Sequence, residues 1–233
     1  MIMLPTPSVP DLARVEGSTP EEAAEWFISF FDSPSVPWNY HRSTRITKVA
    51  YQGIHRPELL LAGCAAEKNP IGKKANEDVV SLAAPHAFGR STQVFDLTPR
   101  KFNFGQSRTS GFRIPFFFTE NKVVKLFYLQ PRKSFALTLS QIAMVATIHK
   151  RFILDQEFFG LTTDLEYIDL SASADGKRKV RRFTLSDLDL WSETELTKRL
   201  SMLSAALDLA QSSGRIQSRT RKPAKALDMP LFD

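Results

Sequence analysis

The stretch FRIPFFFTENKVVKLFYLQ, residues 112–130, decides the fold of this chain. It contains two apolar runs, at 112–119 and 123–130, and the segment Glu120-Asn121-Lys122 between them is short enough for a hairpin turn. Both runs are apolar nearly throughout, which is typical of strands buried on both faces. Pro115 lacks an N–H donor and therefore indicates a sheet edge or a bulge at that point. The stretch predicts a β-hairpin in the middle of the fold.

Segments on either side of this hairpin predict an α/β (α+β) fold. A helical pattern over 138–157 is apolar nearly all round, which is typical of a central helix packed on more than one side. Shorter segments predict helices at 57–66 and 73–82, and strands at 44–51, 92–97, 164–171 and 179–185. The order α-β-β-β-α-β over residues 73–171 predicts a central mixed sheet flanked by helices.

Three helix starts carry a capping box, in which a Ser or Thr and a Glu or Gln three residues later bond each other's backbone N–H groups. The pairs are Thr19 with Glu22, Thr138 with Gln141, and Ser192 with Glu195. The first predicts an N-terminal helix that ends at Asp32, and the last predicts a C-terminal helix.

The predicted C-terminal helix carries Leu196, Leu200, Leu203 and Leu207 on one face. Such a stripe favours docking on the parent domain, and the alternative is a homodimer through residues 192–210. The remaining organisation is an extended arm over 1–18, a single α/β domain over 19–210, and a flexible basic tail with an apolar end over 211–233.

Composition excludes several classes of protein. The chain has 233 residues, of which 42% are hydrophobic and 24% charged, and this balance excludes a wholly disordered chain. No run of eighteen apolar residues is present, so a membrane-spanning helix is not expected. The one cysteine, Cys64, excludes an internal disulfide, and the histidines show no metal-ligand spacing, so no metal site is expected. The first residues lack the pattern of a secretory signal, which predicts a cytoplasmic protein.

The formal net charge of +6 is unevenly distributed along the chain. Residues 1–37 hold six acids against one Arg, whereas residues 98–133 hold eight Lys and Arg against Glu120 alone, and residues 177–182 add five more cations. Such clusters indicate an anionic partner, most often nucleic acid, and the alternative is a set of solvated faces. The candidate nucleic-acid-binding residues are Arg100, Lys101, Arg108, Arg113, Lys125, Arg132, Lys133, Lys177, Arg178, Lys179, Arg181 and Arg182.

Residues 99–113 alternate basic side chains with Phe102, Phe104 and Phe112. In a loop, phenylalanines can stack on bases while Arg and Lys neutralise phosphates, which suits single-stranded or distorted nucleic acid. The alternative, which we favour, is that the phenylalanines anchor the loop to the core.

The α-β-β-β-α-β order over residues 73–171 resembles the core of the restriction-endonuclease-like nucleases, the PD-(D/E)XK superfamily. The resemblance implies that an acid on one central strand and an acid-x-Lys set on the next hold Mg²⁺, which activates a water. Here that set reads Gln130-x-Arg132, and a neutral amide weakens a Mg²⁺ site, so the resemblance implies a degenerate scaffold. In a nuclease, the catalytic candidates would be Asp96, Glu120, Gln130 and Lys133, with Mg²⁺ as the cofactor.

The last residues, Asp228-Met229-Pro230-Leu231-Phe232-Asp233, resemble the short peptide by which bacterial DNA-processing proteins bind the replicative sliding clamp. Met229, Leu231 and Phe232 match its apolar positions, while Asp228 stands where that pattern has Gln. The resemblance implies a sliding clamp as a partner, since a tail with two spaced apolar anchors suits a groove.

Three hypotheses about function remain. The favoured one is a nucleic-acid-binding protein of bacterial or mobile-element DNA metabolism, non-catalytic on a nuclease-like scaffold. The second is a metal-dependent nuclease. The third is a non-enzymatic interaction module that uses the C-terminal leucine helix and the tail.

Overall fold

A computed structural model of the protein describes residues 4–33, 38–53, 56–105 and 108–216. A five-stranded sheet in the order β1-β4-β5-β6-β7 forms its centre, and a separate hairpin pairs β2 with β3. The strands are β1 (Gln93–Asp96), β2 (Lys101–Phe104), β3 (Arg108–Gly111), β4 (Phe116–Glu120), β5 (Val123–Gln130), β6 (Thr163–Asp169) and β7 (Arg181–Phe183). Within the sheet β5 and β6 are parallel and the other neighbours are antiparallel. The predicted α/β class with a mixed sheet is confirmed; the α-β-β-β-α-β order holds for the strands of that sheet, and the hairpin of β2 and β3 lies between β1 and β4 in the sequence.

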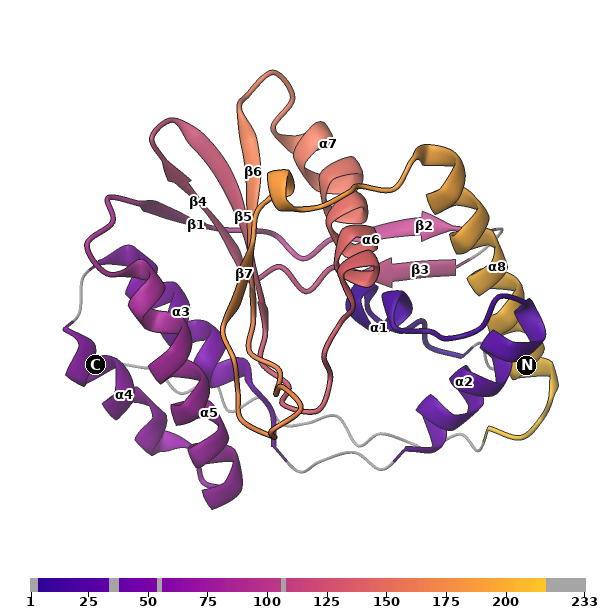
Figure 1. The fold of residues 1–233 in the computed structure, drawn as a ribbon, viewed down its shortest axis with the longest axis horizontal. Helices are drawn as coiled ribbons and strands as arrows, with labels where there is room; N and C mark the ends of the chain where they lie inside the picture. The colour runs from indigo at the N-terminus through magenta and orange to yellow at the C-terminus, as the bar shows by residue number, and fades with distance from the viewer. Residues whose placement is uncertain (1–3, 34–37, 54–55, 106–107, 217–233) are drawn as a thin grey trace.

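Helices lie on both sides of this sheet (Figure 1). They are α1 (Val9–Ala13), α2 (Pro20–Asp32), α3 (His41–Gln52), α4 (Pro57–Ala62), α5 (Pro70–Ala83), α6 (Leu139–His149), α7 (Asp155–Glu157) and α8 (Glu193–Ser212). A π-helical turn, Lys150–Leu154, joins α6 to α7, so the predicted helix over 138–157 is continuous. None of the helices in the described part of the chain has the length and apolar character that a membrane crossing requires.

The turn between β4 and β5 explains the sequence of the predicted hairpin. Glu120 pairs with Val123, so that Asn121 and Lys122 alone connect the strands. Both have a positive φ, 51° and 64°, which is the left-handed conformation that a type I′ turn requires in a two-residue hairpin. Pro115 lies just before the first residue of β4, where its missing donor removes no ladder hydrogen bond.

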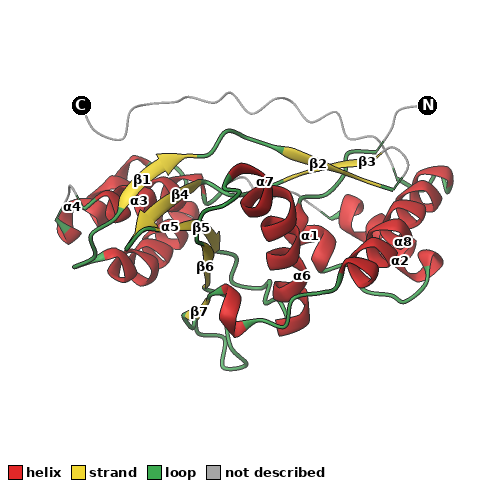
Figure 2. Ribbon diagram, turned by 90° about the horizontal axis from the view of Figure 1, so that it is seen from above, coloured by secondary structure: helices red, strands yellow, loops and turns green. Residues whose placement is uncertain are grey.

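Both faces of the hairpin are buried, because successive side chains of β5 point to opposite sides. On one side, Phe127 of β5 joins Phe116 and Phe118 of β4 in a core shared with α3 and α5. On the other, Leu126 and Tyr128 lie in the core that contains α6. Figure 2, seen from above, shows these two groups of helices on opposite sides of the strands.

The helices α2 and α8 pack against each other on the α6 side of the sheet. The capping boxes of α2, α6 and α8 are all present, which confirms those helix starts. All four leucines of the α8 stripe are buried within the chain, so docking on the parent domain is confirmed. A homodimer through residues 192–210 stays a prediction, and it would have to use other side chains of α8.

Part of the arm predicted over residues 1–18 differs from the extended segment that we expected. Val9–Ala13 forms the helix α1, and Val9, Leu12 and Ala13 are buried in the core with α6. Ser8 Oγ donates to Asp11 Oδ2 at 2.6 Å in its first turn. A helix of five residues is unstable alone, so its burial against α6 is what stabilises it.

Residues 44–51 form most of α3, and the predicted strand there is wrong. The β-branched residues suggested a strand, but Ile46 with Ala50 and Thr47 with Tyr51 are buried four residues apart, which is helical spacing. Packing of that face against α5 outweighs the local strand preference.

A pH dependence of stability follows from His149, at the end of α6. The ring is buried, Nε2 has no partner among the described residues, and burial lowers the pKa to about 3. The unfolded chain binds this proton near pH 6.5. Therefore the free energy of unfolding falls as pH drops from about 6.5 towards 3, and by about 2 kcal/mol at pH 5.

Denaturant unfolding at pH 7 and pH 5 measures this loss. His149→Phe, which suits a site between the rings of Phe112 and Tyr128, is expected to remove about 2 kcal/mol of the difference between the two pH values. An equal difference in the variant and the parent protein would contradict the assignment.

Candidate nucleic-acid interface

The carboxyl ends of β5 and β6 meet at one edge of the sheet, because the two strands are parallel. The loops that follow them continue the contact: Leu170 N donates to Gln130 O at 2.9 Å, and Ala172 N donates to Lys133 O at 2.8 Å. Ligands commonly bind outside the carboxyl ends of strands in open α/β sheets. The backbone positions of Lys133 and of the β6–β7 loop are therefore fixed relative to each other.

The side chain of Arg178 connects the two loops at this edge. Its guanidinium donates to Pro131 O at 2.6 Å and to Leu170 O at 2.9 Å, one carbonyl from each loop. It also donates to the Tyr40 hydroxyl at 3.0 Å, just before α3. These bonds give Arg178 a structural role, and its predicted contact with nucleic acid stays a prediction.

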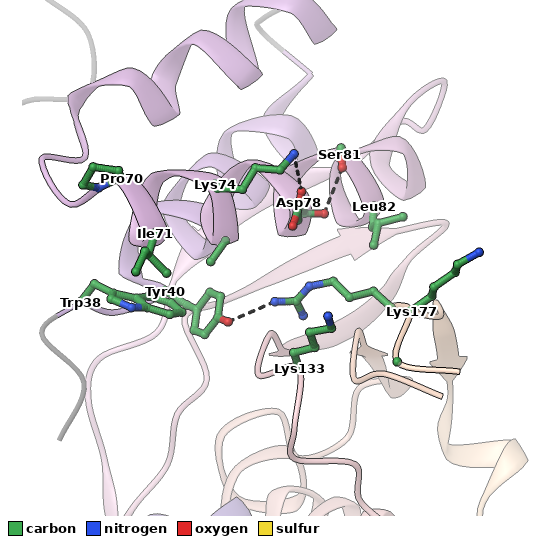
Figure 3. Close-up of a pocket in the computed structure, with 13 residues that line it drawn as sticks. Trp38, Tyr40, Pro70, Ile71, Lys74, Asp78, Ser81, Leu82, Lys133 and Lys177 are labelled. Carbon is green, nitrogen blue, oxygen red and sulfur yellow. Dashed lines mark hydrogen bonds and ion pairs between the residues drawn. The ribbon is translucent and has the colours of Figure 1, made fainter. Parts of the chain in front are cut away.

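An open groove of about 870 Å³ lies beside Arg178, between α5 and the β6–β7 loop (Figure 3). Trp38, Tyr40, Ile71 and Leu82 supply much of its apolar lining, and Lys74, Lys133 and Lys177 supply cations. Lys74 is paired with Asp78 at 3.0 Å. Lys133 and Lys177 are exposed, and neither has an ion pair within the described ranges.

Most of the other predicted cations already have acidic partners. These pairs are Arg100 with Glu157, Arg108 with Asp208, Arg113 and Arg132 with Asp11, Lys125 with Glu120, Arg181 with Asp169, and Arg182 with Glu166. Arg108 is buried, with a side chain only 2% exposed. Lys101 and Lys179 are exposed, but neither lines the groove. The structure thus brings Lys133, Lys177 and Arg178 to one groove, and the other candidates are paired with acids or lie outside its lining.

The nuclease candidates do not form one site. Asp96 lies on the edge strand, 82% exposed, and pairs with Lys48 at 2.5 Å. Glu120 is at the hairpin turn, whereas Gln130 is at the far end of β5, about 23 Å away at about 3.3 Å per residue. The described residues contain no group of three His, Cys, Asp or Glu side chains that could hold a metal. Asp96, Glu120, Gln130 and Lys133 therefore lack the geometry of a shared Mg²⁺ site.

Phe102 and Phe104 are buried in the hairpin of β2 and β3, not displayed in a loop. Both belong to the core, and Phe102 contacts the ring of Phe152 at 4.8 Å between centroids. The favoured alternative, that these phenylalanines anchor the segment, is confirmed. The candidate partner-binding residues Met229, Leu231 and Phe232 lie outside the described residues.

A buried ionic network on the α3 side of the sheet gave no signal in the sequence. Glu166 of β6 is 1% exposed and accepts hydrogen bonds from Tyr51, Arg90 and Arg182. Arg90 also bonds Glu120 at 2.7 Å, and together with Lys125 it lowers the pKa of Glu120 to about 2. Desolvation and the nearby Glu166 raise the pKa of Tyr51, so its hydroxyl stays protonated. These groups are structural, because they satisfy one another.

Sequence reasoning missed Trp38, Tyr40, Ile71 and Lys74 as lining residues of the groove. The closely spaced aromatics Trp38 and Tyr40 were the one available signal. Their proximity to Lys133 depends on how α3 and α5 pack on the sheet, which no local pattern reveals.

Comparisons with known proteins add little to this geometry. No family model and no curated protein matches the chain. Among solved structures, the crystal structure of SSO0001 matches with 16% identity and a TM-score of 0.35, over 82% of this chain and 86% of that chain. A likeness at this level carries no argument about function.

The buried network predicts a large cost for losing Arg90. Arg90→Met is expected to reduce the free energy of unfolding by about 3–5 kcal/mol, because Glu166 is then buried with too little compensating charge. The measurement is unfolding in urea at pH 7. Lys48→Met is the matched control, since it breaks only the exposed pair with Asp96 and should cost less than about 1 kcal/mol. Similar losses in both variants would contradict the prediction.

Proposed function

We propose that the chain is a cytoplasmic, non-catalytic nucleic-acid-binding protein whose groove at the carboxyl ends of β5 and β6 contacts phosphates through Lys133 and Lys177. One observation carries the proposal: both ammonium groups are exposed and have no acidic partner among the described residues. Most of the other predicted cations do have an acidic partner. A phosphate can bind them without first breaking an ion pair.

The rigidity of the groove supports the proposal. Lys133 contributes its own carbonyl to the hydrogen bond with Ala172, and Arg178 bonds both loops. These bonds fix the backbone from which both lysine side chains extend, so less of the loops has to be ordered when a phosphate binds.

A non-catalytic role is supported by the dispersed acids. The strand order still resembles the nuclease core described above, but Glu120 is engaged with Arg90 and Lys125, and Asp96 with Lys48. Partnership with a sliding clamp through Met229, Leu231 and Phe232 is a separate proposal that rests on the peptide resemblance alone.

The double variant Lys133→Gln/Lys177→Gln tests the phosphate contacts. We expect weaker binding to DNA or RNA and a shallower salt dependence, because two phosphate contacts are lost. The slope of log K against log salt should fall by about 1.4 for a single strand or about 1.8 for a duplex. Fluorescence anisotropy across a salt series measures both the affinity and the slope.

Lys122→Gln/Lys198→Gln is the matched control, since it removes the same charge from exposed residues. Lys122 lies in the hairpin turn at the opposite end of β5 from the groove, and Lys198 lies on α8. Equal weakening in the two double variants would mean that net charge, not the groove, drives binding. Absence of binding by the parent protein at low salt would reject the proposal altogether.

A further inference from the structure

The segment that carries Trp38 and Tyr40 is held in place by α5. Asn76, fully buried in that helix, donates to Asn39 O at 3.0 Å and accepts from Ser43 N at 2.8 Å. Gly72 leaves room for the Trp38 side chain, since a Cβ there would lie 2.8 Å from Trp38 Cβ and 3.1 Å from Trp38 Cγ. Trp38 is therefore positioned on the first turns of α5 before any ligand arrives.

Trp38 is the better placed of the two rings to receive a ligand. The Tyr40 hydroxyl bonds Arg178, whose guanidinium also lies 5.8 Å from the centre of the Tyr40 ring. Trp38 meets Tyr40 only edge to face, with 4.9 Å between centroids and 78° between planes. Its ring has no stacked aromatic partner within the part of the chain that the structure describes.

The apolar side chains of the groove offer no favourable contact to phosphates. Ile71, 70% exposed, and Leu82 line the groove with Trp38, while Lys133 and Lys177 supply the free cations. A duplex keeps its bases stacked on each other and presents mainly phosphates to an open surface. A single strand offers the faces of its bases, and a base that stacks on an aromatic ring binds without regard to sequence.

We infer that the groove binds single-stranded nucleic acid, with one base stacked on Trp38 and the adjoining phosphates on Lys133 and Lys177. This inference rests on the proposed function and gives it a substrate class. The stacking site lies at residues 38–40 and not in 99–113, because Phe102 and Phe104 of that segment are buried. Trp38 is thus the specificity-determining residue of the groove.

The test compares three probes on the full chain: a short oligothymidylate, an oligouridylate of the same length, and a DNA duplex of equal length. The parent protein should bind a single strand more tightly than the duplex. Trp38→Ala should weaken single-strand binding about 5- to 150-fold, because the stacking of one base is lost. Duplex binding should not change. Trp38→Phe, which keeps an aromatic face, should retain most of the affinity. The two single strands show whether DNA or RNA binds more tightly.

A spectroscopic measurement separates stacking from a merely structural role. In Trp26→Phe/Trp191→Phe, the only tryptophan left is Trp38, and its fluorescence should be quenched when a single strand binds. The unfolding midpoint of each variant checks that it is folded.

The outcomes distinguish this inference from the proposed function. If Lys133→Gln/Lys177→Gln weakens binding while Trp38→Ala changes single-strand affinity less than about twofold, the groove binds the phosphate backbone alone and the inference is overturned. Equal affinity of the parent protein for single strands and duplex overturns it as well. If the lysine variant also binds like the parent, the proposed function itself fails.

Discussion

The parallel pairing of β5 with β6 is the constraint on which the rest of this structure depends. Parallel neighbours cannot be joined by a tight turn, so the chain must cross one face of the sheet, and α6 is that crossover. The paired strands then need cover on the opposite face, which α3 and α5 provide. The same pairing places both carboxyl ends at one edge. Therefore a single side chain, Arg178, can bond a carbonyl of each following loop.

Charge compensation between distant parts of the chain decides which cations remain free. Arg108 pairs with Asp208, Arg132 with Asp11, and Arg90 with Glu166, and each pair joins segments far apart in sequence. Removing a charge from water costs several kcal/mol, so a buried arginine or glutamate requires such a partner. Lys133 and Lys177 lie on exposed loops, where water solvates the ammonium group and no partner is needed. A basic cluster in the sequence therefore contains more cations than remain without an acidic partner on the surface.

Local signals predicted much of the fold. The three capping boxes predicted helix starts correctly because their bonds involve residues only three apart. The hairpin was predictable because its turn and both apolar runs are contiguous in the sequence. The elements that were missed depend on distant contacts. α1 is too short to form without α6, and the strand-like residues of α3 become helical because Ile46 and Ala50 face the core. The site was less predictable still, since Trp38 and Lys133 meet only in the folded chain.

The small number of unpaired lysines among the described residues that line the groove has a consequence for how the groove would discriminate among nucleic acids. A protein that makes about 6–10 phosphate contacts loses about 10³- to 10⁵-fold in affinity between 50 and 200 mM salt. Here Lys133 and Lys177 can neutralise only a few phosphates, since Lys74 is paired with Asp78 and the guanidinium of Arg178 is held by hydrogen bonds to Tyr40 and two backbone carbonyls. Stacking of one base contributes about 1–3 kcal/mol, which is a large share of a small total. If the groove binds nucleic acid as we propose, the aromatic contact, rather than the charge, would set the preference between a single strand and a duplex, because only the single strand can make it.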